Sequence, residues 1–355
     1  MERVLVGMSG GVDSAVAAYL LQDMGYDVAG VTLRTWTPEY GEENSRCCDI
    51  DDAKEICRVL DIPYHVCDCA RDFHKKVVSP FIDDYIRGIT PNPCIGCNKD
   101  LKWAKMIEMA DRLDAKYVAT GHYASVVKLE NGRYTVKRAG YAAKDQTYML
   151  YKLTQEQLSR TLMPLGDISK DEVRRIAKEC NLAVADKPDS QEICFVPDDD
   201  YAGYIEKNHK GELPGEGDFV DSEGNVLGRH KGIIHYTVGQ RKGLGIAFGV
   251  PMYVKRIDAD NNRVILAADE DLYTETVKCR DINIMSMDIP DTGRKVRCRA
   301  KIRYRHEASD ATFEITGNDT LTIAFEKPVR AASPGQSAVM YDEDGNLIGG
   351  GIICN

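Results

Sequence analysis

The sequence of 355 residues predicts an α/β protein that begins with a parallel-sheet domain and continues into two smaller, β-rich units. Up to about residue 120, strand-like and helix-like segments alternate, which is typical of a parallel sheet covered by helices on both faces. Beyond about residue 211 the helical periodicity fades, and turn-forming clusters separate short β-prone runs, as in small antiparallel barrels or sheets. We place the domain boundaries near residues 207 and 272.

Apolar spacing and turn residues define the individual elements. The predicted strands cover residues 3–7, 26–33, 64–67 and 116–120, and the predicted helices cover residues 12–24, 50–60, 72–87 and 99–113. Residues 89–93, Ile-Thr-Pro-Asn-Pro, must form a loop, because proline lacks an amide donor and restricts the residue before it. Residues 125–138 are predicted to form a hairpin around Asn131-Gly132. Residues 169–172 form a capping box, which predicts a helix that runs to about Cys180.

The bulk composition is that of an ordinary globular protein, with 43% hydrophobic and 29% charged residues. No apolar run reaches the roughly 18 residues of a membrane span, and no secretory leader is apparent. We therefore expect a cytoplasmic protein without a membrane partner. In that compartment the 12 cysteines should be thiols and not a disulfide framework.

The charge distribution bears on nucleic-acid binding. The net charge of -10 argues weakly against nonspecific binding of RNA, which depends on cations near phosphates. Between Arg297 and Arg305, however, a cation stands at every second position, which would form one basic face on a strand. That face is either an RNA contact or simply solvated.

A glycine-rich loop at the first strand–helix junction is the strongest motif. It reads Val6-Gly7-Met8-Ser9-Gly10-Gly11-Val12-Asp13-Ser14. Glycines allow tight turns and close approach of a ligand, and amides at a helix start bind anions. The hydroxyls of Ser9 and Ser14 add donors. The loop lacks the Gly-Lys-Ser/Thr of kinases and GTPases and fails the spacing of the dinucleotide fingerprint.

This string resembles the Ser-Gly-Gly-x-Asp-Ser loop of the N-type ATP pyrophosphatases, the PP-loop superfamily. The resemblance implies that ATP is split between its α and β phosphates and that a carbonyl oxygen is adenylated, which makes it a good leaving group. Asp13 would hold Mg²⁺ on the pyrophosphate or, as an ordinary acid at a helix start, only complement the dipole.

Three cysteines are candidates for the nucleophile that follows adenylation. Cys94 and Cys97 lie three residues apart just before a predicted helix, where a thiol ionises more easily, and Lys99 and Lys102 add positive charge. Cys194 is the third thiol. The other cysteines, Cys47 and Cys48 among them, have structural interpretations.

The whole set of motifs resembles the tRNA-specific 2-thiouridylases (MnmA/TrmU family). The segments that carry the resemblance are Asn92-Pro93 with Cys97-Asn98-Lys99, Thr120-Gly121-His122-Tyr123-Ala124, Lys144-Asp145-Gln146-Thr147-Tyr148, Asp189-Ser190-Gln191-Glu192-Ile193-Cys194-Phe195-Val196, Gly239-Gln240-Arg241-Lys242-Gly243-Leu244-Gly245 and Ser333-Pro334-Gly335-Gln336. They follow that family's order from residue 3 to the C-terminus.

The resemblance implies a PP-loop catalytic domain over 1–207, a central domain over 208–272 and a C-terminal antiparallel β-barrel over 273–355. It implies 2-thiolation of the wobble uridine of Lys, Glu and Gln tRNAs, with Cys97 as first catalytic cysteine and Cys194 as carrier of a persulfide. The sulfur would come from a cysteine desulfurase, a relay protein or sulfide. Residues 7–14, Leu33 and Gly121 would hold ATP. The expected tRNA contacts are Asn92, Pro93, Cys94, His122, Lys144, Asp145, Gln146, Arg303, Tyr304 and Gln336, with Arg241 and Lys242 either facing RNA or solvated.

One departure from the family pattern concerns Cys94, where many members carry Asp. Cys94, Cys97 and Cys194 could together ligate three irons of a 4Fe–4S cluster and leave one iron open. The persulfide relay is the alternative, and structural zinc would need a fourth ligand.

Two rival functions remain at this stage. An ammonia-using synthetase of the same superfamily would not need the three cysteines, and a non-catalytic RNA-binding module would leave the phosphate loop unexplained.

Overall fold

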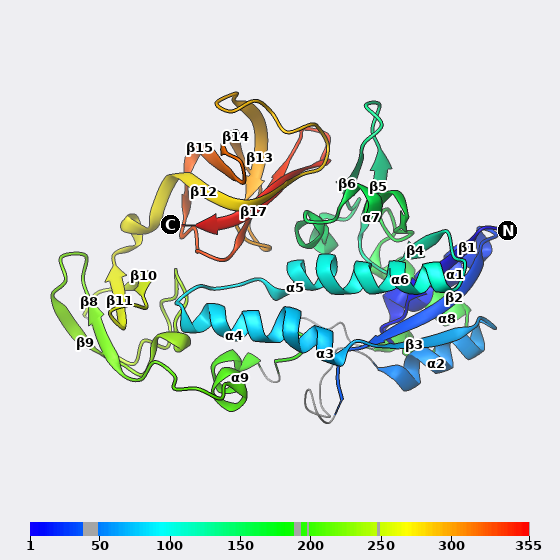
Figure 1. Cartoon of the computed structure of the whole chain (residues 1–355), viewed down its shortest axis with the longest axis horizontal. Helices are drawn as coiled ribbons and strands as arrows, with labels where there is room; N and C mark the ends of the chain where they lie inside the picture. The colour runs from blue at the N-terminus through cyan, green and yellow to red at the C-terminus, as the bar shows by residue number, and fades with distance from the viewer. Residues whose placement is uncertain (38–48, 188–192, 197–198, 247–248, 355) are drawn as a thin grey trace.

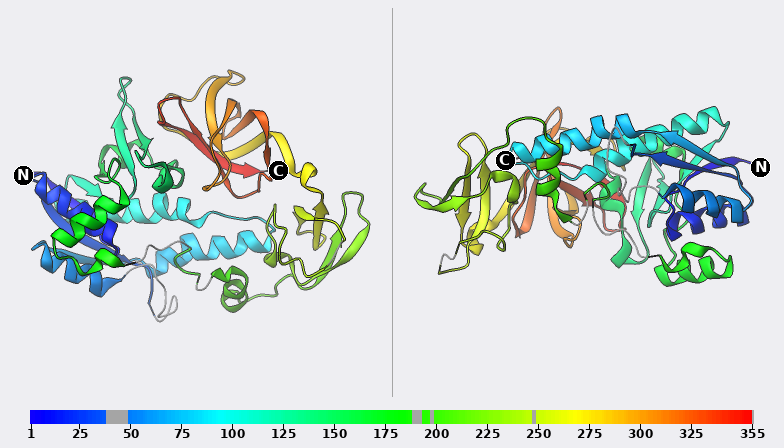
Figure 2. Two further views of the ribbon diagram at one scale, coloured as in Figure 1. Left: turned by 180° about the vertical axis from the view of Figure 1, so that it is seen from behind. Right: turned by 90° about the horizontal axis from the view of Figure 1, so that it is seen from below.

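The computed structural model describes residues 1–37, 49–187, 193–196, 199–246 and 249–354. The predicted Cys47 and Cys48 and the motif residues 189–192 lie outside these ranges. A parallel sheet near the N-terminus and a small central domain occupy opposite ends of the molecule (Figure 1). Long helices run between them, and a C-terminal barrel lies beside these helices, as the views in Figure 2 also show.

The N-terminal sheet consists of five parallel strands in the order β3-β2-β1-β4-β7. Their bounds are β1 Arg3–Gly7, β2 Asp27–Arg34, β3 Tyr64–Asp68, β4 Tyr117–Ala119 and β7 Thr161–Leu162. The first four confirm the predicted strands. The sequence analysis missed β7, because two residues are too short to show a period.

Helices cover both faces of this sheet, as predicted. Val4 and Val6 belong to a core with α1 Val12–Asp23, α2 Ile50–Val59 and α8 Lys170–Glu179. Leu5 points to the opposite face of the sheet and belongs to a second core with the helices of residues 70–112. The central strand is thus buried on both sides, which is why it is a continuous apolar run.

Two interrupted helices form the long connection seen in Figure 1. The first comprises α3 Ala70–Phe73, the π-helical η1 His74–Val78 and α4 Ser79–Ile86. The second comprises α5 Pro93–Gly96, the π-helical η2 Cys97–Trp103 and α6 Ala104–Arg112. They confirm the predicted helices and the loop between them, and the second begins earlier than residue 99. π-Helical turns are rare and occur frequently at functional sites.

A hairpin and several short helices connect the sheet to the barrel. They are β5 Ala124–Lys128, β6 Tyr134–Arg138, η3 Ala142–Lys144, η4 Thr147–Leu150, α7 Gln155–Ser159, η5 Ala183–Asp186 and α9 Tyr201–Asn208. The hairpin around Asn131-Gly132 is confirmed. The predicted capping box is only half correct. Ser169 accepts from the amide of Glu172, but the Glu172 carboxylate pairs with Arg175.

The two later units are built of strands, as expected. The central sheet, in the order β10-β11-β8-β9, contains β8 Gly217–Val220, β9 Val226–His230, β10 Tyr253–Asp258 and β11 Arg263–Ala267. Its β8–β11 pair is parallel, so the expectation of an antiparallel unit is wrong there. Short helices η7 Ile233–His235 and η8 Asp269–Leu272 flank it.

The C-terminal unit is a closed antiparallel barrel of six strands, in the order β12-β15-β14-β13-β16-β17. Its strands are β12 Tyr273–Ile284, β13 Val296–Lys301, β14 Ser309–Gly317, β15 Thr320–Arg330, β16 Ser337–Tyr341 and β17 Leu347–Cys354. Within the described ranges, no helix has the length and apolarity needed to cross a bilayer.

The predicted basic face is shorter than its sequence suggests. Arg297 and Arg299 are exposed on β13, but Lys301 is buried and the strand ends there. Burial lowers the pKa of the Lys301 ammonium, with the charges of Asp145 and Arg138 nearby. Alternation along a strand therefore predicts the two exposed arginines correctly, whereas packing against the hairpin side covers the third cation.

The core of the sheet provides a stability prediction. Leu5→Ala, at a fully buried position of the central strand, should lower the free energy of unfolding by about 2–5 kcal/mol, because it removes apolar contacts and leaves a cavity. Val66→Ala on the edge strand β3, where Val66 is 44% exposed, is the matched control and should cost about 0.5 kcal/mol. Urea denaturation followed by circular dichroism measures both. Equal effects would contradict the assignment of β1 as the core strand.

Candidate functional site

The site lies at the carboxyl edge of the parallel sheet, where ligands bind in open α/β folds. The loop after β1 leads into α1, Leu33 lies near the end of β2, and Gly121 follows β4. These segments come from neighbouring strands in the order β2-β1-β4, so the sheet brings all the predicted ATP residues to one edge.

Internal hydrogen bonds shape the phosphate loop. The Ser9 amide donates to Ser14 Oγ over 3.2 Å, and Ser14 Oγ donates to the Gly11 carbonyl over 3.0 Å. Ser14 is buried, and its hydroxyl holds the loop through these two bonds. Gly11 is the N-cap of α1, and no side chain among the described residues caps this helix. The amides at its start can therefore receive an anion.

Two glycines of the site have no room for a side chain. A Cβ on Gly121 would lie 2.6 Å from the Asp13 carbonyl carbon and 2.7 Å from the Ser14 amide nitrogen. Gly10 has a φ of +75°, and a Cβ there would lie 2.6 Å from the Asp49 carbonyl oxygen. The strand β4 end and the α2 start thus press directly on the loop backbone.

Asp13 is held by two groups that the sequence analysis missed. Its Oδ1 accepts from the Tyr123 hydroxyl and from Lys170 Nζ, each over 2.7 Å. Tyr123 belongs to the Thr-Gly-His-Tyr-Ala motif, but Lys170 was considered only as part of a capping box. The carboxylate expected to hold Mg²⁺ is therefore already oriented by protein donors.

Lys187 is a third missed residue. Its Nζ donates to Asp52 over 2.5 Å, to Asp49 over 2.9 Å and to the Gly10 carbonyl over 3.3 Å. Burial opposes the charge of Lys187, but the bonds to Asp52 and Asp49 outweigh it and raise its pKa. Lys187 lies 177 residues from Gly10 in sequence, so only the folded structure reveals this contact.

These residues fit ATP with Mg²⁺. An uncapped helix start, a glycine cradle that a Cβ would fill, and a lysine beside the loop are what a polyphosphate requires. Asp13, Asp49 and Asp52 carry the oxygen donors that Mg²⁺ prefers, but no three such side chains among the described residues form a ready ion site, so the phosphates would have to complete the coordination.

The segment of Cys94 and Cys97 is tightly fixed. Asn92 is the N-cap of α5 and accepts from the Cys94 amide over 3.2 Å. Cys97 is buried and is the first residue of η2. Asn98 donates to the Met149 carbonyl over 3.0 Å, but its buried Oδ1 has no partner among the described residues. A buried acceptor without a donor is costly, so this oxygen beside Cys97 is suited to receive one from a ligand.

Cys194 lies in the described segment 193–196 and packs against the same apolar core that contains Cys97. The next residue, Phe195, contacts Phe73 and Phe81 edge-on, with ring centroids 5.6 and 5.2 Å apart. The fold thus places Cys97 and Cys194 at one apolar core although they are far apart in sequence. All ten described cysteines are thiols.

The three-cysteine metal site is not seen as a preformed group in the described part of the chain. Among the described residues, no three His, Cys, Asp or Glu side chains come together in a way that could hold a metal ion. Burial raises the pKa of the Tyr304 phenol, and the charges of Asp145 and Cys94 add to this effect. Cys94 therefore lies in the vicinity of Tyr304. The ligand set of Cys94, Cys97 and Cys194 stays a prediction, which the iron content of the purified protein tests.

Several expected tRNA contacts have partners within the protein. Asp145 is 5% exposed and accepts from Thr147 and Arg138, so its placement contradicts a direct tRNA contact. Gln146 accepts from the Tyr123 amide over 2.9 Å. Arg303 donates to the Ala331 carbonyl, and burial lowers its pKa. Lys144, Asn92, Pro93 and Tyr304 remain partly exposed.

His122 packs within the site as a neutral base. Its ring lies 5.5 Å from the Trp103 ring, centroid to centroid, and Nδ1 is 2.8 Å from Thr120 Oγ1. Although the residue as a whole is partly exposed, burial of the ring, with the charge of Lys102 adding to it, lowers the pKa of His122 to about 3.

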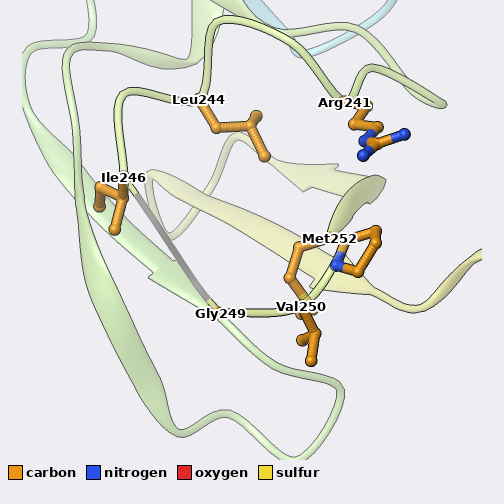
Figure 3. A pocket seen from close by; sticks show the side chains of 7 residues that line it. Arg241, Leu244, Ile246, Gly249, Val250 and Met252 are labelled. Atoms are coloured by element: carbon orange, nitrogen blue, oxygen red, sulfur yellow. The ribbon is translucent and has the colours of Figure 1, made fainter.

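A separate hollow of about 380 Å³ lies in the central domain (Figure 3). Arg241, Leu244, Ile246, Val250 and Met252 contribute to its lining. Arg241 lies over the Tyr253 ring, 5.9 Å from its centroid, and is exposed, as is Lys242. This hollow contains none of the expected ATP or cysteine residues.

The sequence matches three family models in series. They are described as the tRNA methyl transferase HUP domain (residues 2–198), the tRNA methyl transferase PRC-barrel domain (205–268) and the aminomethyltransferase beta-barrel domain (274–353).

Two curated relatives match over nearly their whole length. The tRNA-specific 2-thiouridylase MnmA of Lachnoclostridium phytofermentans is 50% identical, over 99% of this chain and 99% of that protein. The tRNA-specific 2-thiouridylase MnmA of Clostridioides difficile is 50% identical, over 99% of this chain and 98% of that protein. Among solved structures, the tRNA thiolase NcsA from Methanococcus maripaludis with its 4Fe–4S cluster is 20% identical. Its TM-score is 0.35, over 54% of this chain and 60% of that one, too low to carry an argument.

The contact of Gly121 with the phosphate loop gives a prediction for ATP binding. Gly121→Ala should weaken the binding of a nonhydrolysable ATP analogue at least about tenfold, because the new Cβ displaces the backbone at Asp13 and Ser14. Gly215→Ala is the control, since a Cβ there meets no described atom within 4 Å. Isothermal titration calorimetry measures both, and an unchanged affinity of Gly121→Ala would remove Gly121 from the site.

The lowered pKa of His122 gives a pH prediction. The unfolded state binds the proton near pH 6.5 and the folded state only near pH 3, so stability falls as the pH decreases from about 6.5. From pH 7.5 to 5, the wild type should lose about 1–2 kcal/mol more than His122→Gln. Denaturant unfolding at the two pH values measures this difference. Parallel losses in both proteins would show that His122 titrates normally.

Proposed function

The chain belongs to the family of tRNA-specific 2-thiouridylases, and from that premise we propose how its own residues carry out the reaction. The enzyme is an ATP-dependent sulfurtransferase that 2-thiolates a wobble uridine of tRNA. We assign residues 1–207 to ATP cleavage and cysteine chemistry, 208–272 to a central adaptor, and 273–355 to a tRNA-contacting barrel. The substrates we propose are the Lys, Glu and Gln tRNAs.

The observation that carries the proposal is that an uncapped helix start lies in one domain with two thiols, Cys97 and Cys194, of a single apolar core. The amides of residues 10–12 bind the phosphates of ATP, and Asp13, oriented by Tyr123 and Lys170, is the carboxylate that would approach Mg²⁺. Attack of the uracil C2 oxygen on the α-phosphate releases pyrophosphate and leaves an adenylated base. The protein contributes position and charge stabilisation.

Sulfur transfer follows through two cysteines. A persulfide on Cys194 attacks C2 with its terminal sulfur, and AMP leaves with the C2 oxygen. The Cys97 thiolate then attacks the sulfur of Cys194, and the bond to the transferred sulfur breaks, so that 2-thiouridine is released. The electrons remain balanced because a Cys97–Cys194 disulfide forms. A thiol reductant must reduce that disulfide, and a cysteine desulfurase or relay protein must supply each persulfide.

The persulfide relay is favoured over the iron–sulfur alternative because the described residues do not gather Cys94, Cys97 and Cys194 as ligands. Cys94, which lies near Tyr304, is then a polar neighbour of the base. An ammonia-dependent synthetase is not favoured, since it has no use for the paired Cys97 and Cys194. A non-catalytic RNA-binding module is not favoured, because it has no use for the phosphate loop.

The cysteine assignment predicts a separation of the two half-reactions. Cys97→Ser and Cys194→Ser should each reduce 2-thiouridine formation below about 1% of wild type, since each removes an essential nucleophile. Release of pyrophosphate in the presence of tRNA should persist at a first turnover, because adenylation of the base precedes sulfur transfer. Cys180→Ala is the control, because Cys180 is not one of the two proposed sulfur-transfer cysteines. Nucleoside mass spectrometry and pyrophosphate assays measure both steps, and substantial thiolation by either serine variant would overturn the relay.

A Cys94→Asp variant separates the relay from the cluster. Under the relay it should thiolate tRNA within about tenfold of wild type, supplied with a persulfide donor and without iron. Anaerobically purified wild type should then contain far fewer than about four irons per chain. A brown, iron-loaded wild type and an inactive Cys94→Asp would establish the cluster and overturn the relay, while leaving the 2-thiouridylase assignment standing.

A further inference from the structure

A turn of the barrel contacts the backbone directly before the cysteine segment. The Thr90 amide donates to the Pro334 carbonyl over 3.0 Å. Gln336 Nε2 donates to the carbonyls of Thr90 and Pro91 over 3.0 and 3.2 Å. These three bonds fix the residues that lead into Asn92, the N-cap of the helix that carries Cys94 and Cys97.

A second set of hydrogen bonds, to Met149, fixes the same segment. Met149 of η4 receives Asn92 Nδ2 at its sulfur over 3.6 Å and Asn98 Nδ2 at its carbonyl over 3.0 Å, so it brackets both cysteines. The barrel in turn holds η4, because the Tyr148 hydroxyl donates to the Ser337 carbonyl over 2.8 Å and accepts from the Ser337 amide over 3.3 Å. Both sets of hydrogen bonds therefore originate in adjacent residues of the barrel, Gln336 and Ser337.

We propose that the barrel residues 333–337, here called the barrel turn, position the Cys97 nucleophile, and that Gln336 acts as a positioning residue for it. The inference rests on the proposed role of Cys97. Both donor hydrogens of the Gln336 amide are directed at protein carbonyls, so its nitrogen holds the loop before the cysteines and its oxygen is left for another partner. The barrel thus contributes to catalysis through the cysteine segment in addition to any RNA contact.

The backbone of the barrel turn shows how closely the two parts fit. Gly335 has a φ of +89°, and a Cβ there would lie 2.3 Å from Ile89 Cγ2 and 2.8 Å from the Thr90 carbonyl oxygen. Ile89 and Thr90 belong to the loop that precedes the cysteines. A methyl group on Gly335 would therefore push that loop away from the barrel.

The chain offers a matched control for this substitution. Gly293, also in the barrel, has a φ of +82°, and a Cβ there meets no described atom within 4 Å. Gly335→Ala and Gly293→Ala therefore carry a similar backbone strain, whereas only the first displaces the cysteine loop.

The test compares kcat with tRNA affinity in the full chain. Gly335→Ala should lower kcat for 2-thiolation about 100-fold, because a nucleophile displaced by about an ångström reacts poorly. Gly293→Ala should stay within about twofold of wild type. Affinity for tRNA, measured by filter binding, should not change in either variant. Equal kcat values for the two glycine variants would overturn the proposal.

Gln336→Glu is the second variant, which keeps the shape of the side chain but replaces its donors by acceptors facing two carbonyl oxygens. It should lower kcat and leave the Kd for tRNA within about twofold. A raised Kd with unchanged kcat would instead identify Gln336 as a tRNA contact. Thermal unfolding checks that each variant is folded. If Gly335→Ala does not fold, the kcat and Kd of Gln336→Glu decide whether the barrel turn positions Cys97.

Alkylation of Cys97 tests the inference without the reaction. In wild type Cys97 is buried and should react slowly with iodoacetamide. In Gln336→Glu, which loses the two bonds, the rate of Cys97 alkylation should rise about tenfold, as measured by mass spectrometry. Cys298 in the barrel core is the internal control and should stay slow. Unchanged Cys97 alkylation would overturn the proposal. Failure of wild type to thiolate tRNA would instead contradict the proposed function.

Discussion

The buried seam between η4 and the barrel strand β16 is the contact on which the cysteine site depends. Tyr148 and Tyr151 are fully buried there, and their hydroxyls pair with the backbone and side chain of Ser337. Thr147 meets the Tyr341 hydroxyl over 3.1 Å. Buried polar groups are costly when unpaired, so this set of bonds permits only one register of the barrel against the catalytic domain. The position of η4, and through Met149 that of Asn92 and Asn98, follows from that register.

The same seam explains why Asp145 is buried. Its Oδ1 accepts from the Thr147 amide and hydroxyl, and Arg138 lies 3.3 Å from its Oδ2. Arg138 also lies over the Tyr341 ring, 5.3 Å from its centroid. A buried polar side chain without hydrogen-bond partners would be costly. The carboxylate thus stabilises the junction between the hairpin side of the catalytic domain and the barrel, and the family motif that contains Asp145 is in this respect a structural motif.

The sequence predicts what is local and misses what the fold brings together. Apolar periodicity located four of the five parallel strands, and the string from Gly7 to Ser14 identified the phosphate loop because its glycines are required by local geometry. The partners of Asp13 and Gly10, by contrast, are Lys170 and Lys187, which are more than 150 residues away. Lysines are common on helix surfaces, so their own sequence context gives no signal. Gln336 was identified by its motif, but its partners Thr90 and Pro91 lie 246 and 245 residues away, which no periodicity can reveal.

The charges around the phosphate loop favour an ATP that arrives with its metal. Asp49 and Asp52 lie beside the Gly10 turn, and Lys187 is the cation paired with both. The hydrogen bond from Lys187 lowers the pKa of Asp49, so this carboxylate stays ionised and the group of three carries one net negative charge. Free ATP is itself negatively charged and would be repelled, because like charges repel each other at such distances. Mg²⁺ on the phosphates removes the repulsion and gives the carboxylates a hard cation to approach. With the loop amides toward the phosphates and the carboxylates toward the metal, the acidic surroundings of the loop would be compatible with binding an anion.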